Sequence, residues 1–418
     1  MHIWIANHYA VPPNIGGITR HYELACEWTN EEQTEVTLWL SSFNHSRRRA
    51  IDEESKRELK PVPGLHLRWI WSFPHSENDI RRVLNMLSFA FLFLLKGLFR
   101  RRPDVLFAST PHLLTPLSGW ILSKVKRCPF VLEVRDLWPD TLVKMGGLKN
   151  PLMIKVLSGL ERFLYKKANK IVVLTEYQRK FIQSKGIDAA KISLIPNGIV
   201  KGSWKPDSMK RKTCRRRMGI APHQFLTLYA GAHGPANALE YVVRAGEYLP
   251  DHYAIVLIGD GPEKNRLQKI KKERGLHNVH FYAPVSKDEI YNYIDAADCG
   301  VISLADNEIF RGARPNKLFD YMYVGKPIIT TVDGEVREIV EGNRLGLFSG
   351  AESAQGLAEA IVRIRSFSVH EKEQIANRGR WYIEQYGDRQ KLAAHLYREL
   401  ESLLCNGIRK INEVKRSG

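Results

Sequence analysis

The stretch Phe225-Leu-Thr-Leu-Tyr-Ala-Gly-Ala-His-Gly-Pro-Ala-Asn-Ala-Leu239 joins an apolar strand, a glycine-rich turn and the start of a helix. Such units are typical of parallel sheets, because a parallel strand needs a crossover connection before the next one. Similar units recur along the whole chain. The expected strands lie at 3–6, 36–40, 105–108, 130–134 and 171–174, and then at 225–230, 254–258, 279–282, 300–303 and 327–331. The sequence therefore predicts an α/β protein with two doubly wound domains.

The seam between the two domains is expected after the segment Ile195-Pro-Asn-Gly-Ile199, which contains both proline and glycine. The stretch from there to residue 217 is polar, basic and weakly periodic. Its densest basic run, 210–217, is interpreted as the solvated face of a helix in preference to a specific anion site.

The chain has 418 residues and a formal net charge of +18, from 63 Lys and Arg against 45 Asp and Glu. This excess indicates an anionic partner, and composition leaves nucleic acid, a membrane surface and phosphorylated small molecules open. The five cysteines never occur as C-x-x-C, which argues against a zinc cage or a disulfide framework and favours a reducing compartment. Residues 1–9 lack the pattern of a secretory signal.

One segment, 81–102, departs from the soluble pattern. Its apolar part, 83–99, lies between two arginines and three arginines, and Asn85 and Lys96 interrupt it. It is shorter than the ~20 residues that a transmembrane span needs, so no span is expected. A helix rich in Phe and Leu between arginines suits a membrane interface or a groove for lipid tails. A core helix buried on all sides would look the same, and both interpretations stay open.

Charged and aromatic residues follow the expected strand 130–134, where open α/β sheets bind ligands. Asp136 and Asp140 can bond substrate hydroxyls or merely cap the next helix, and Trp138 can stack on a sugar or close the core. Arg135 belongs to the same cluster.

Three glycine-rich turns follow other strands, and helix starts next to such turns favour anions. The residues singled out in these turns are Gly16, Gly17, Gly231, His233, Gly234, Gly259, Gly261 and Glu263. Glycine pairs also occur in ordinary tight turns, and helix capping alone would explain Glu263.

The richest motif is 311–327. Arg314 and Lys317 lie near a helix start that already favours anions, and Asp320 lies three residues after Lys317, on the same face. Cations for phosphate oxygens beside a carboxylate for vicinal hydroxyls would suit a nucleoside diphosphate.

Taken together, these motifs resemble those of glycosyltransferase family 4, whose members are retaining transferases with the GT-B fold. The most specific match is 315–327, which follows the family pattern P-[SN]-K-[LI]-[FY]-E-Y-M-x-x-G-K-P. The other matching segments are 14–20, 134–140, 195–199, 230–234 and 259–263. The chain is most similar to the bacterial branch that builds O-antigen and capsule, including N-acetylfucosamine transferases.

The resemblance implies two Rossmann-like domains that face a central cleft. The acceptor-side domain would comprise 1–199, and the nucleotide-sugar domain 200–384. A C-terminal helix within 385–418 would return to the first domain. The residues expected to act in catalysis are Asp136, Arg314 and Lys317. The three turns, with Arg314, Lys317 and Asp320, would bind the donor, and Arg135, Asp136, Trp138 and Asp140 would line the acceptor and sugar cleft.

The sequence also departs from the family pattern. Asp320 takes the second place of the family's E-x7-E pair, where a carboxylate binds the ribose, and Gly312 takes the first place. Arg135 replaces the usual histidine of the sugar-cleft segment. The Arg and Lys that clamp the diphosphate in the family are missing from 231–240, so Arg314, Lys317 or the first domain would have to neutralise it.

By this resemblance, the protein would transfer a sugar with retention from a nucleotide-diphosphate donor, expected to be a UDP-sugar, to a lipid-linked saccharide. An N-acetylated amino or deoxy sugar is expected, with neither a metal nor another cofactor. The expected location is cytoplasmic, peripheral on the inner face of the plasma membrane, with 81–102 on anionic lipid. Nucleic acid is not an expected partner, because the aromatics are not interleaved with the basic runs. Two alternatives stay open, a GT-B nucleotide-sugar epimerase and a non-catalytic anionic-lipid-binding protein.

Overall fold

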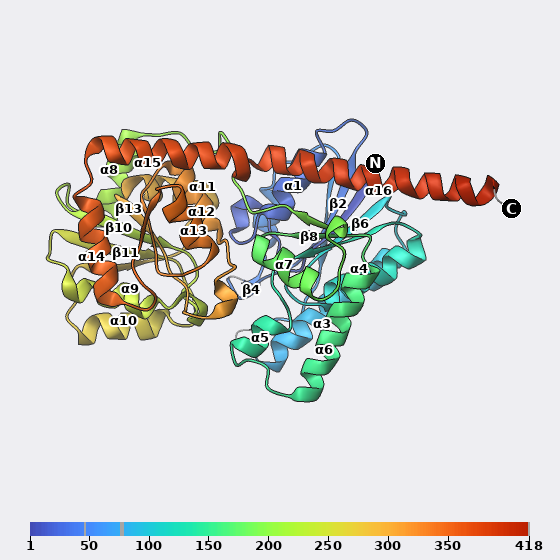
Figure 1. Ribbon diagram of the computed structural model, residues 1–418, viewed down its shortest axis with the longest axis horizontal. Helices are drawn as coiled ribbons and strands as arrows, with labels where there is room; N and C mark the ends of the chain where they lie inside the picture. Colours follow the sequence, from blue (N-terminus) through green and yellow to red (C-terminus); the bar gives the residue numbers. More distant parts are fainter. Residues whose placement is uncertain (46, 76–78, 417–418) are drawn as a thin grey trace. The chain divides into compact units, whose positions relative to one another are not determined.

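The computed structural model describes residues 1–45, 47–75 and 79–416, without the side chains of 288 and 406–416. The chain divides into two compact units (Figure 1). Unit 1 consists of Met1–Pro196 and Arg389–Gly418, and unit 2 of Asn197–Asp388. The division after Pro196 lies just before the seam expected after Ile199.

The sheet of unit 1 is parallel, with the strand order β5-β2-β1-β6-β7-β8-β9. Its strands are β1 (His2–Ala6), β2 (Glu35–Ser41), β5 (Leu65–Ile70), β6 (Val105–Ser109), β7 (Phe130–Val134), β8 (Lys170–Val173) and β9 (Ile192–Leu194). The strands β3 (Phe43–Asn44) and β4 (Arg49–Ala50) form a short antiparallel pair. The central strands β1, β6 and β7 are almost wholly buried, because helices cover both faces of the sheet.

One face of this sheet packs around Phe89, Phe93 and Leu164, and the other around Trp28, Leu396 and Leu400. The helices of unit 1 are α1 (Arg20–Trp28), α2 (Glu53–Arg57), α3 (Ile80–Leu98), α4 (Leu114–Lys126), α5 (Asp140–Lys144), α6 (Pro151–Lys167), α7 (Glu176–Ser184) and α16 (Arg389–Arg416). Four of these helices, α1, α3, α6 and α16, supply the packing residues just named. The helix α16 belongs to unit 1 although almost two hundred residues of unit 2 precede it, which confirms the predicted return of the C-terminal helix.

The sheet of unit 2 is also parallel, in the order β12-β11-β10-β13-β14-β15. Its strands are β10 (Phe225–Ala230), β11 (Tyr253–Ile258), β12 (Val279–Tyr282), β13 (Cys299–Ile302), β14 (Ile328–Thr330) and β15 (Gly346–Phe348). The helices are α8 (Ser208–Arg217), α9 (Leu239–Arg244), α10 (Lys264–Glu273), α11 (Lys287–Ala296), α12 (Asn316–Val324), α13 (Glu335–Gly342), α14 (Ala354–Arg365) and α15 (Val369–Tyr382). Two Rossmann-like units confirm the predicted α/β class.

The apolar segment 83–99 forms most of α3, and this helix is apolar on two opposite faces. One face is buried and packs on the sheet through Phe89 and Phe93. The opposite face is also apolar but exposed, with Ile80, Leu84, Leu87, Phe91, Leu95 and Leu98 at helical spacing. The core interpretation therefore describes the buried face, and the membrane interpretation stays a prediction for the exposed face. Among the helices in the described part of the chain, none combines the length and apolar character that a bilayer span requires.

Candidate functional site

Each sheet has a point where the chain changes the direction in which it adds strands, and ligands of open α/β sheets bind at the carboxyl ends of the strands there. In unit 1 this point lies between β1 and β6, which are followed by Asn7 and Thr110. In unit 2 it lies between β10 and β13, and Gly231 follows β10.

A buried carboxylate organises the switch point of unit 1. Glu133, at the end of β7, accepts hydrogen bonds from Arg20 Nε at 2.8 Å, His21 Nε2 at 2.6 Å and Ser109 Oγ at 2.6 Å. Burial by itself raises the pKa of Glu133, but His21 and Arg20 outweigh it and hold that pKa well below its usual range. The Arg20 guanidinium also donates to the carbonyl oxygens of Ile195 and Pro196. Through Arg20, Glu133 thereby links the start of α1 to the backbone of Ile195 and Pro196.

The turn after β7 presents Asp136. The Thr110 hydroxyl accepts from the backbone N–H of Arg135 at 2.8 Å, and Gln178 Nε2 donates to the Arg135 carbonyl at 2.7 Å. With the backbone fixed in this way, Asp136 keeps an exposed surface, while the surrounding protein raises the pKa of its carboxyl against the opposing charge of Arg135. The structure therefore places a carboxylate on a rigid turn at the carboxyl edge of the sheet.

Trp138 and Asp140 have structural contacts in unit 1. Trp138 is half-buried and packs against the core cluster around Phe130 and Leu164. Asp140 Oδ2 lies 3.2 Å from Lys185 Nζ, which also binds the buried Glu161. Asp140 thus joins an ion-pair chain that links α5 and α6 through the residue that follows α7, whereas the sequence had left substrate binding and helix capping open.

A group of four histidines follows β1, β3, β5 and β6, and sequence reasoning missed it. His8 Nδ1 lies 2.9 Å from His112 Nε2, and His45 Nδ1 lies 3.4 Å from His75 Nε2. Burial and the charge of Arg82 lower the pKa of both His45 and His112 to about 3, so both imidazoles are neutral at neutral pH. Neutral imidazoles can both donate to and accept from hydroxyl groups. The signal available in the sequence was the position of His8 and His112 just after two expected strands.

Gly16 and Gly17 lie between a single 3-10 turn, Pro13–Ile15, and the start of α1. Both have positive φ, +74° and +143°. The Gly16 carbonyl accepts from Asn44 Nδ2 at 3.0 Å, and a Cβ at Gly16 would lie 3.1 Å from Arg47 Nη2. This loop therefore needs glycine at Gly16 for backbone conformation and for close packing.

In unit 2, Lys317 is the second residue of α12, whose N-terminus lacks a side-chain cap. Its Nζ lies 3.9 Å from the centroid of the Tyr229 ring, and a Cβ at Gly231 would lie 3.2 Å from it. Burial lowers the pKa of Lys317 to about 7, an effect that Asp320 partly opposes. A helix N-terminus, an ammonium group and a glycine turn thus meet at the switch point of this unit, as an anion site requires.

The other glycines of unit 2 hold two turns together. A Cβ at Gly259 would lie 1.8 Å from the Gly231 carbonyl oxygen, and one at Gly261 would lie 2.5 Å from the His233 carbonyl oxygen. The His233 and Glu263 backbone N–H groups donate across the same junction, to Asp260 and His233. Gly234 caps the 3-10 turn Pro235–Asn237. The pair of turns therefore packs backbone against backbone.

The His233 side chain is fully buried, and neither ring nitrogen has a hydrogen-bond partner among the described residues. Burial, together with the charge of Lys264, lowers the pKa of His233 to about 4. A neutral buried imidazole beside Gly259 is thus available to a ligand that reaches this turn.

Arg314 and Asp320 have partners that the sequence did not predict. Arg314 Nε donates to Glu335 Oε2 at 2.5 Å, at the start of α13. Asp320 Oδ1 accepts from Lys287 Nζ at 2.8 Å and from the Tyr291 hydroxyl at 3.2 Å. Asp320, expected on the same face as Lys317, therefore forms its ion pair with Lys287 of α11.

Comparison with known proteins decides the family. Residues 16–198 match the model of the "Glycosyl transferase 4-like domain", and residues 224–366 match that of "Glycosyl transferases group 1". The chain belongs to the family 4 glycosyltransferases. Together the two matches span most of both units, which confirms the resemblance drawn from the motifs.

Two relatives illustrate the branch of this glycosyltransferase. It is 24% identical over 342 residues to WcaI of Escherichia coli strain K12, named for colanic acid biosynthesis, with 77% of this chain and 81% of WcaI covered. It is 28% identical over 320 residues to TuaC of Bacillus subtilis strain 168, named for teichuronic acid biosynthesis, with 76% and 70% covered. Neither name mentions N-acetylfucosamine.

Solved structures share the GT-B fold. HepE of Anabaena, crystallised with UDP and glucose, superposes with a TM-score of 0.73 at 17% identity, over 96% of this chain and 100% of HepE. WaaG, a glycosyltransferase of lipopolysaccharide biosynthesis, superposes with a TM-score of 0.66 at 14% identity, over 94% and 98%. The predicted GT-B fold is thereby confirmed.

Proposed function

We propose that this glycosyltransferase moves a sugar, with retention of configuration, from a UDP-sugar to a lipid-linked saccharide in bacterial surface polysaccharide synthesis. The observation that supports it most directly is Lys317 at the uncapped start of α12, against Tyr229 and Gly231. An ammonium group and helix N–H groups would hold the diphosphate there. The names of WcaI and TuaC and the ligands of HepE support the polysaccharide and the UDP-sugar.

In the proposed reaction, the bond between the sugar C1 and the donor phosphate oxygen breaks while the acceptor hydroxyl oxygen bonds to C1 on the same face. The hydroxyl proton passes to the departing phosphate oxygen. No protein nucleophile is needed, so catalysis depends on stabilising the charge of the leaving diphosphate. Lys317 is the side chain that we assign to this charge. Arg314 would stabilise the diphosphate only if its hydrogen bond to Glu335 were broken.

We place the acceptor against unit 1. Asp136 is exposed on a rigid turn at the carboxyl edge of the sheet, and the histidine group contributes neutral imidazoles at the same edge. Carboxylates and neutral imidazoles are suitable partners for saccharide hydroxyls.

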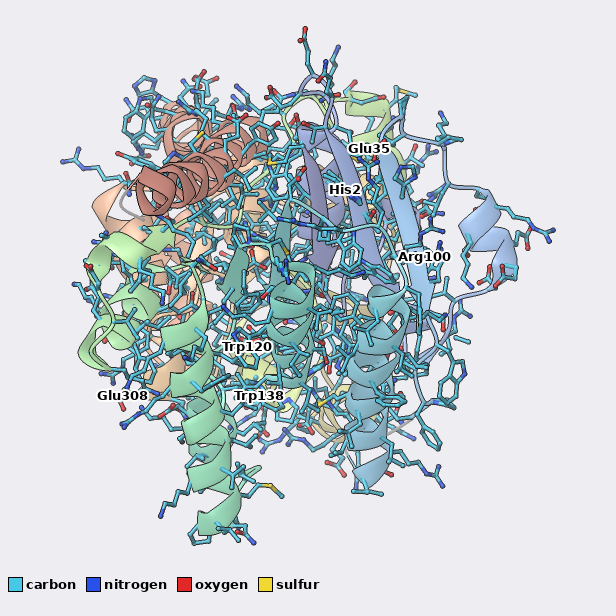
Figure 2. The ribbon with its side chains drawn as sticks, turned by 90° about the vertical axis from the view of Figure 1, so that its right-hand side faces the viewer. His2, Glu35, Arg100, Trp120, Trp138 and Glu308 are labelled. Carbon is cyan, nitrogen blue, oxygen red and sulfur yellow. The ribbon has the colours of Figure 1, made fainter. Side chains whose placement is uncertain are left out.

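The lipid part of the acceptor would be reached from the exposed face of α3. Figure 2 views unit 1 from the side on which α3, α4 and α6 run alongside one another, and α4 contacts both of its neighbours. Besides the apolar face of α3, α6 exposes Leu152, Met153 and Val156. Arginines 100–102 lie after the C-terminal end of α3. Apolar side chains near basic residues suit the interface of an anionic membrane, and we propose that unit 1 binds there on the cytoplasmic side.

The test is substitution of Lys317. Lys317→Ala should cut turnover at least a hundredfold, because one charge-stabilising donor contributes about 10²–10³ to kcat. Lys269→Ala, on the exposed side of α10, is the matched control and should leave turnover unchanged. In parallel, UDP, GDP and dTDP are compared by thermal shift, with UDP expected to stabilise the wild type most. Wild-type turnover in Lys317→Ala would overturn the proposal.

A further inference from the structure

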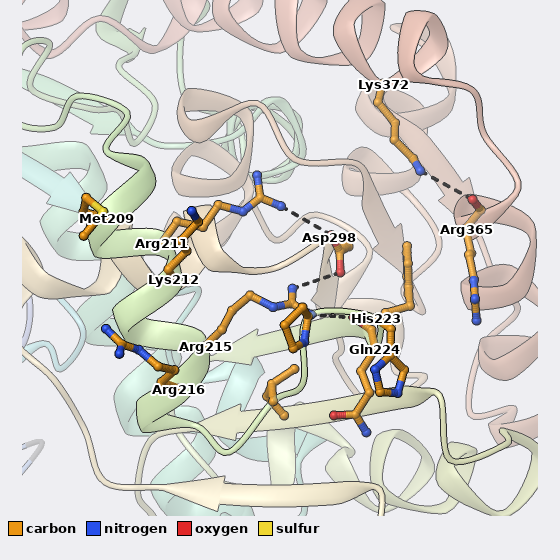
Figure 3. A pocket seen from close by; sticks show the side chains of 13 residues that line it. Met209, Arg211, Lys212, Arg215, Arg216, His223, Gln224, Asp298, Arg365 and Lys372 are labelled. Atoms are coloured by element: carbon orange, nitrogen blue, oxygen red, sulfur yellow. Dashed lines mark hydrogen bonds and ion pairs between the residues drawn. The ribbon is translucent and has the colours of Figure 1, made fainter.

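A cavity of about 700 Å³ opens in unit 2 at the edge of the sheet opposite to the switch point (Figure 3). Phe225, which lines it, is the first residue of β10, and Asp298, which also lines it, directly precedes β13. The donor elements described above follow the carboxyl ends of the same strands. The cavity is therefore a separate site from the proposed donor site.

Positive charge dominates the lining of this cavity. The side chains that contribute charge are Arg211, Lys212, Arg215, Arg216, Arg365, Lys372 and Asp298. Asp298 is the one carboxylate among the described residues that line the cavity, and it already pairs with Arg211 at 3.5 Å and Arg215 at 3.3 Å. Lys212 and Arg216 are exposed and have no ion pair with any described carboxylate. Unneutralised cations converge here, so an anionic ligand would be stabilised.

Part of this charge is fixed in place by the fold. Arg215 donates to the carbonyl oxygens of Ala296 at 3.0 Å and Ala221 at 3.1 Å, and 12% of its side chain is exposed. Arg365 lies with its guanidinium carbon 4.9 Å from the centroid of the Tyr253 ring. Within the described part of the chain, the buried Nε of Arg215 and the buried Nη1 of Arg365 lack hydrogen-bond partners. Buried donors without acceptors are costly, and a bound oxyanion is one way to satisfy them.

The rest of the lining is mostly apolar, with Met209, Ile220, Pro222 and Phe225 beside the polar His223 and Gln224. Lys372 Nζ lies 6.0 Å from the centroid of the Phe225 ring. Charge on one part of the wall and apolar surface on another favour a ligand with an anionic head and an apolar or planar body. The basic run 210–217 lies on helix α8 and has several exposed side chains, as expected of a solvated face, and four of its residues also line this wall.

We propose that this cavity, the α8 pocket, binds a phosphate-bearing ligand with an apolar body. Guanidinium groups match phosphate oxygens in geometry as well as charge, and the single acidic side chain of the wall is neutralised by its arginine partners. A soluble phosphate ester and the headgroup of an anionic phospholipid share this chemistry. The inference goes beyond the proposed transfer reaction, since the donor diphosphate is assigned to the opposite edge of the sheet.

The experiment is made in the Lys317→Ala background, so that the proposed donor site does not contribute. Binding of inorganic diphosphate is measured by calorimetry, and binding to phosphatidylcholine vesicles with and without phosphatidylglycerol by co-sedimentation. The test variant is Lys212→Ala with Arg216→Ala, both exposed residues. The matched control is Lys269→Ala with Arg363→Ala, which removes the same charge from exposed helix faces outside the pocket.

The test variant should bind at least about tenfold more weakly than the control, because two charge-assisted contacts are lost. Loss in the diphosphate arm supports a soluble phosphate ester, and loss confined to the anionic vesicles supports a phospholipid headgroup. Equal binding by the test variant and the control in both arms would overturn the inference, as would binding of neither probe by the Lys317→Ala parent. None of these outcomes depends on turnover, so failure here is distinct from failure of the proposed function.

Discussion

Lys317 combines a buried ammonium group with a position at a helix start, and this makes its charge sensitive to pH. Burial lowers its pKa to about 7. A bound diphosphate favours the charged form, so the affinity for UDP should be highest below pH 7 and fall as the pH rises above it. The fall approaches about tenfold for each pH unit while the free lysine is neutral. Calorimetric titration of UDP between pH 6 and 9 measures it.

Lys317→Arg is the matched control for this pH dependence, because a guanidinium keeps its proton throughout that range. Its affinity for UDP should vary little with pH. The free energy of unfolding of the UDP-free protein should change with pH in the opposite direction, because its contribution from Lys317 improves as the pH rises. The folded-state pKa lies below that of the unfolded chain, so burial of the charge costs most below pH 7, and this cost fades as the pH rises toward about 10.4. Lys317→Met should therefore raise the melting temperature more at pH 6 than at pH 9. A flat UDP affinity in the wild type would contradict the assigned role.

Glu133 shows how one buried charge can hold several elements together. Glu133→Gln removes the charge that pairs with Arg20, itself 2% exposed, and should cost about 3–5 kcal/mol of unfolding free energy at pH 7. Because the pKa of Glu133 is held below its unfolded value, this contribution is present above about pH 4.3 and is lost as the pH falls through the folded pKa. Urea denaturation at pH 7 and at lower pH measures both effects.

Glu176→Gln is the control for Glu133. Glu176 pairs with Arg179 one turn along α7, on the partly exposed surface, and such a pair contributes less than about 1 kcal/mol. If both variants lose equally little stability, the buried network around Glu133 does not have the importance assigned to it.

At the scale of elements, α3 has two apolar faces with different contacts. The variant Leu84→Ser with Leu87→Ser and Phe91→Ser changes only exposed residues of the face that we assign to the membrane. Co-sedimentation with vesicles containing phosphatidylglycerol should fall at least about tenfold, because burial of each such side chain contributes about 1 kcal/mol or more. The urea midpoint should change little, since these side chains make few contacts in the folded protein.

Val362→Ser with Val369→Ser, two exposed apolar residues of unit 2, serves as the control for α3. Raising the salt concentration should weaken binding of the wild type, because surface attraction to anionic lipid is screened. Vesicle binding that survives in the α3 variant would assign the exposed face another role.

The elements that could be predicted from the sequence are those with a strong periodic signal. Each expected strand corresponds to a strand of the structure, because buried parallel strands are continuous apolar runs. Besides the short pair β3 and β4, sequence reasoning missed β5, β9 and β15, which lie at the edges of the two parallel sheets. β5 is partly exposed along its length, and β9 and β15 have three residues each. Short or half-exposed strands leave little pattern to detect.

The sequence could predict which residues belong to the candidate site, but not the hydrogen bonds and ion pairs that these residues form. Lys317 was found because it lies within the specific run 315–327, at a helix start. The bonds of Arg314 to Glu335 and of Asp320 to Lys287 join positions 21 and 33 residues apart. No local spacing encodes such contacts, and the same is true of the histidine group. The α8 pocket was missed for a related reason, since its wall combines α8 with Asp298 before β13 and with residues of α14 and α15.

At the scale of the whole molecule, the last helix, α16, completes the hydrophobic core of unit 1. Leu396 and Leu400 are fully buried in the cluster around Trp28, whose Nε1 donates to the Ala393 carbonyl at 3.0 Å. Leu396→Ala with Leu400→Ala should cost about 2–5 kcal/mol for each side chain removed. Because α16 packs within unit 1, the loss should fall on unit 1, and hydrogen exchange should quicken in β6 and β7 far more than in β10 and β11.

Leu357→Ala, in the core of unit 2, provides the reciprocal control and should quicken exchange in β10 and β11 instead. UDP adds a second readout, because a ligand stabilises what it binds: under the proposed function it should slow exchange around Gly231 and leave β6 unchanged. Equal loss of protection in both sheets of the α16 variant would show that the two units unfold as one. In that case α16 would have to be assigned a role in the stability of both, since its core contacts in unit 1 could not by themselves explain the result.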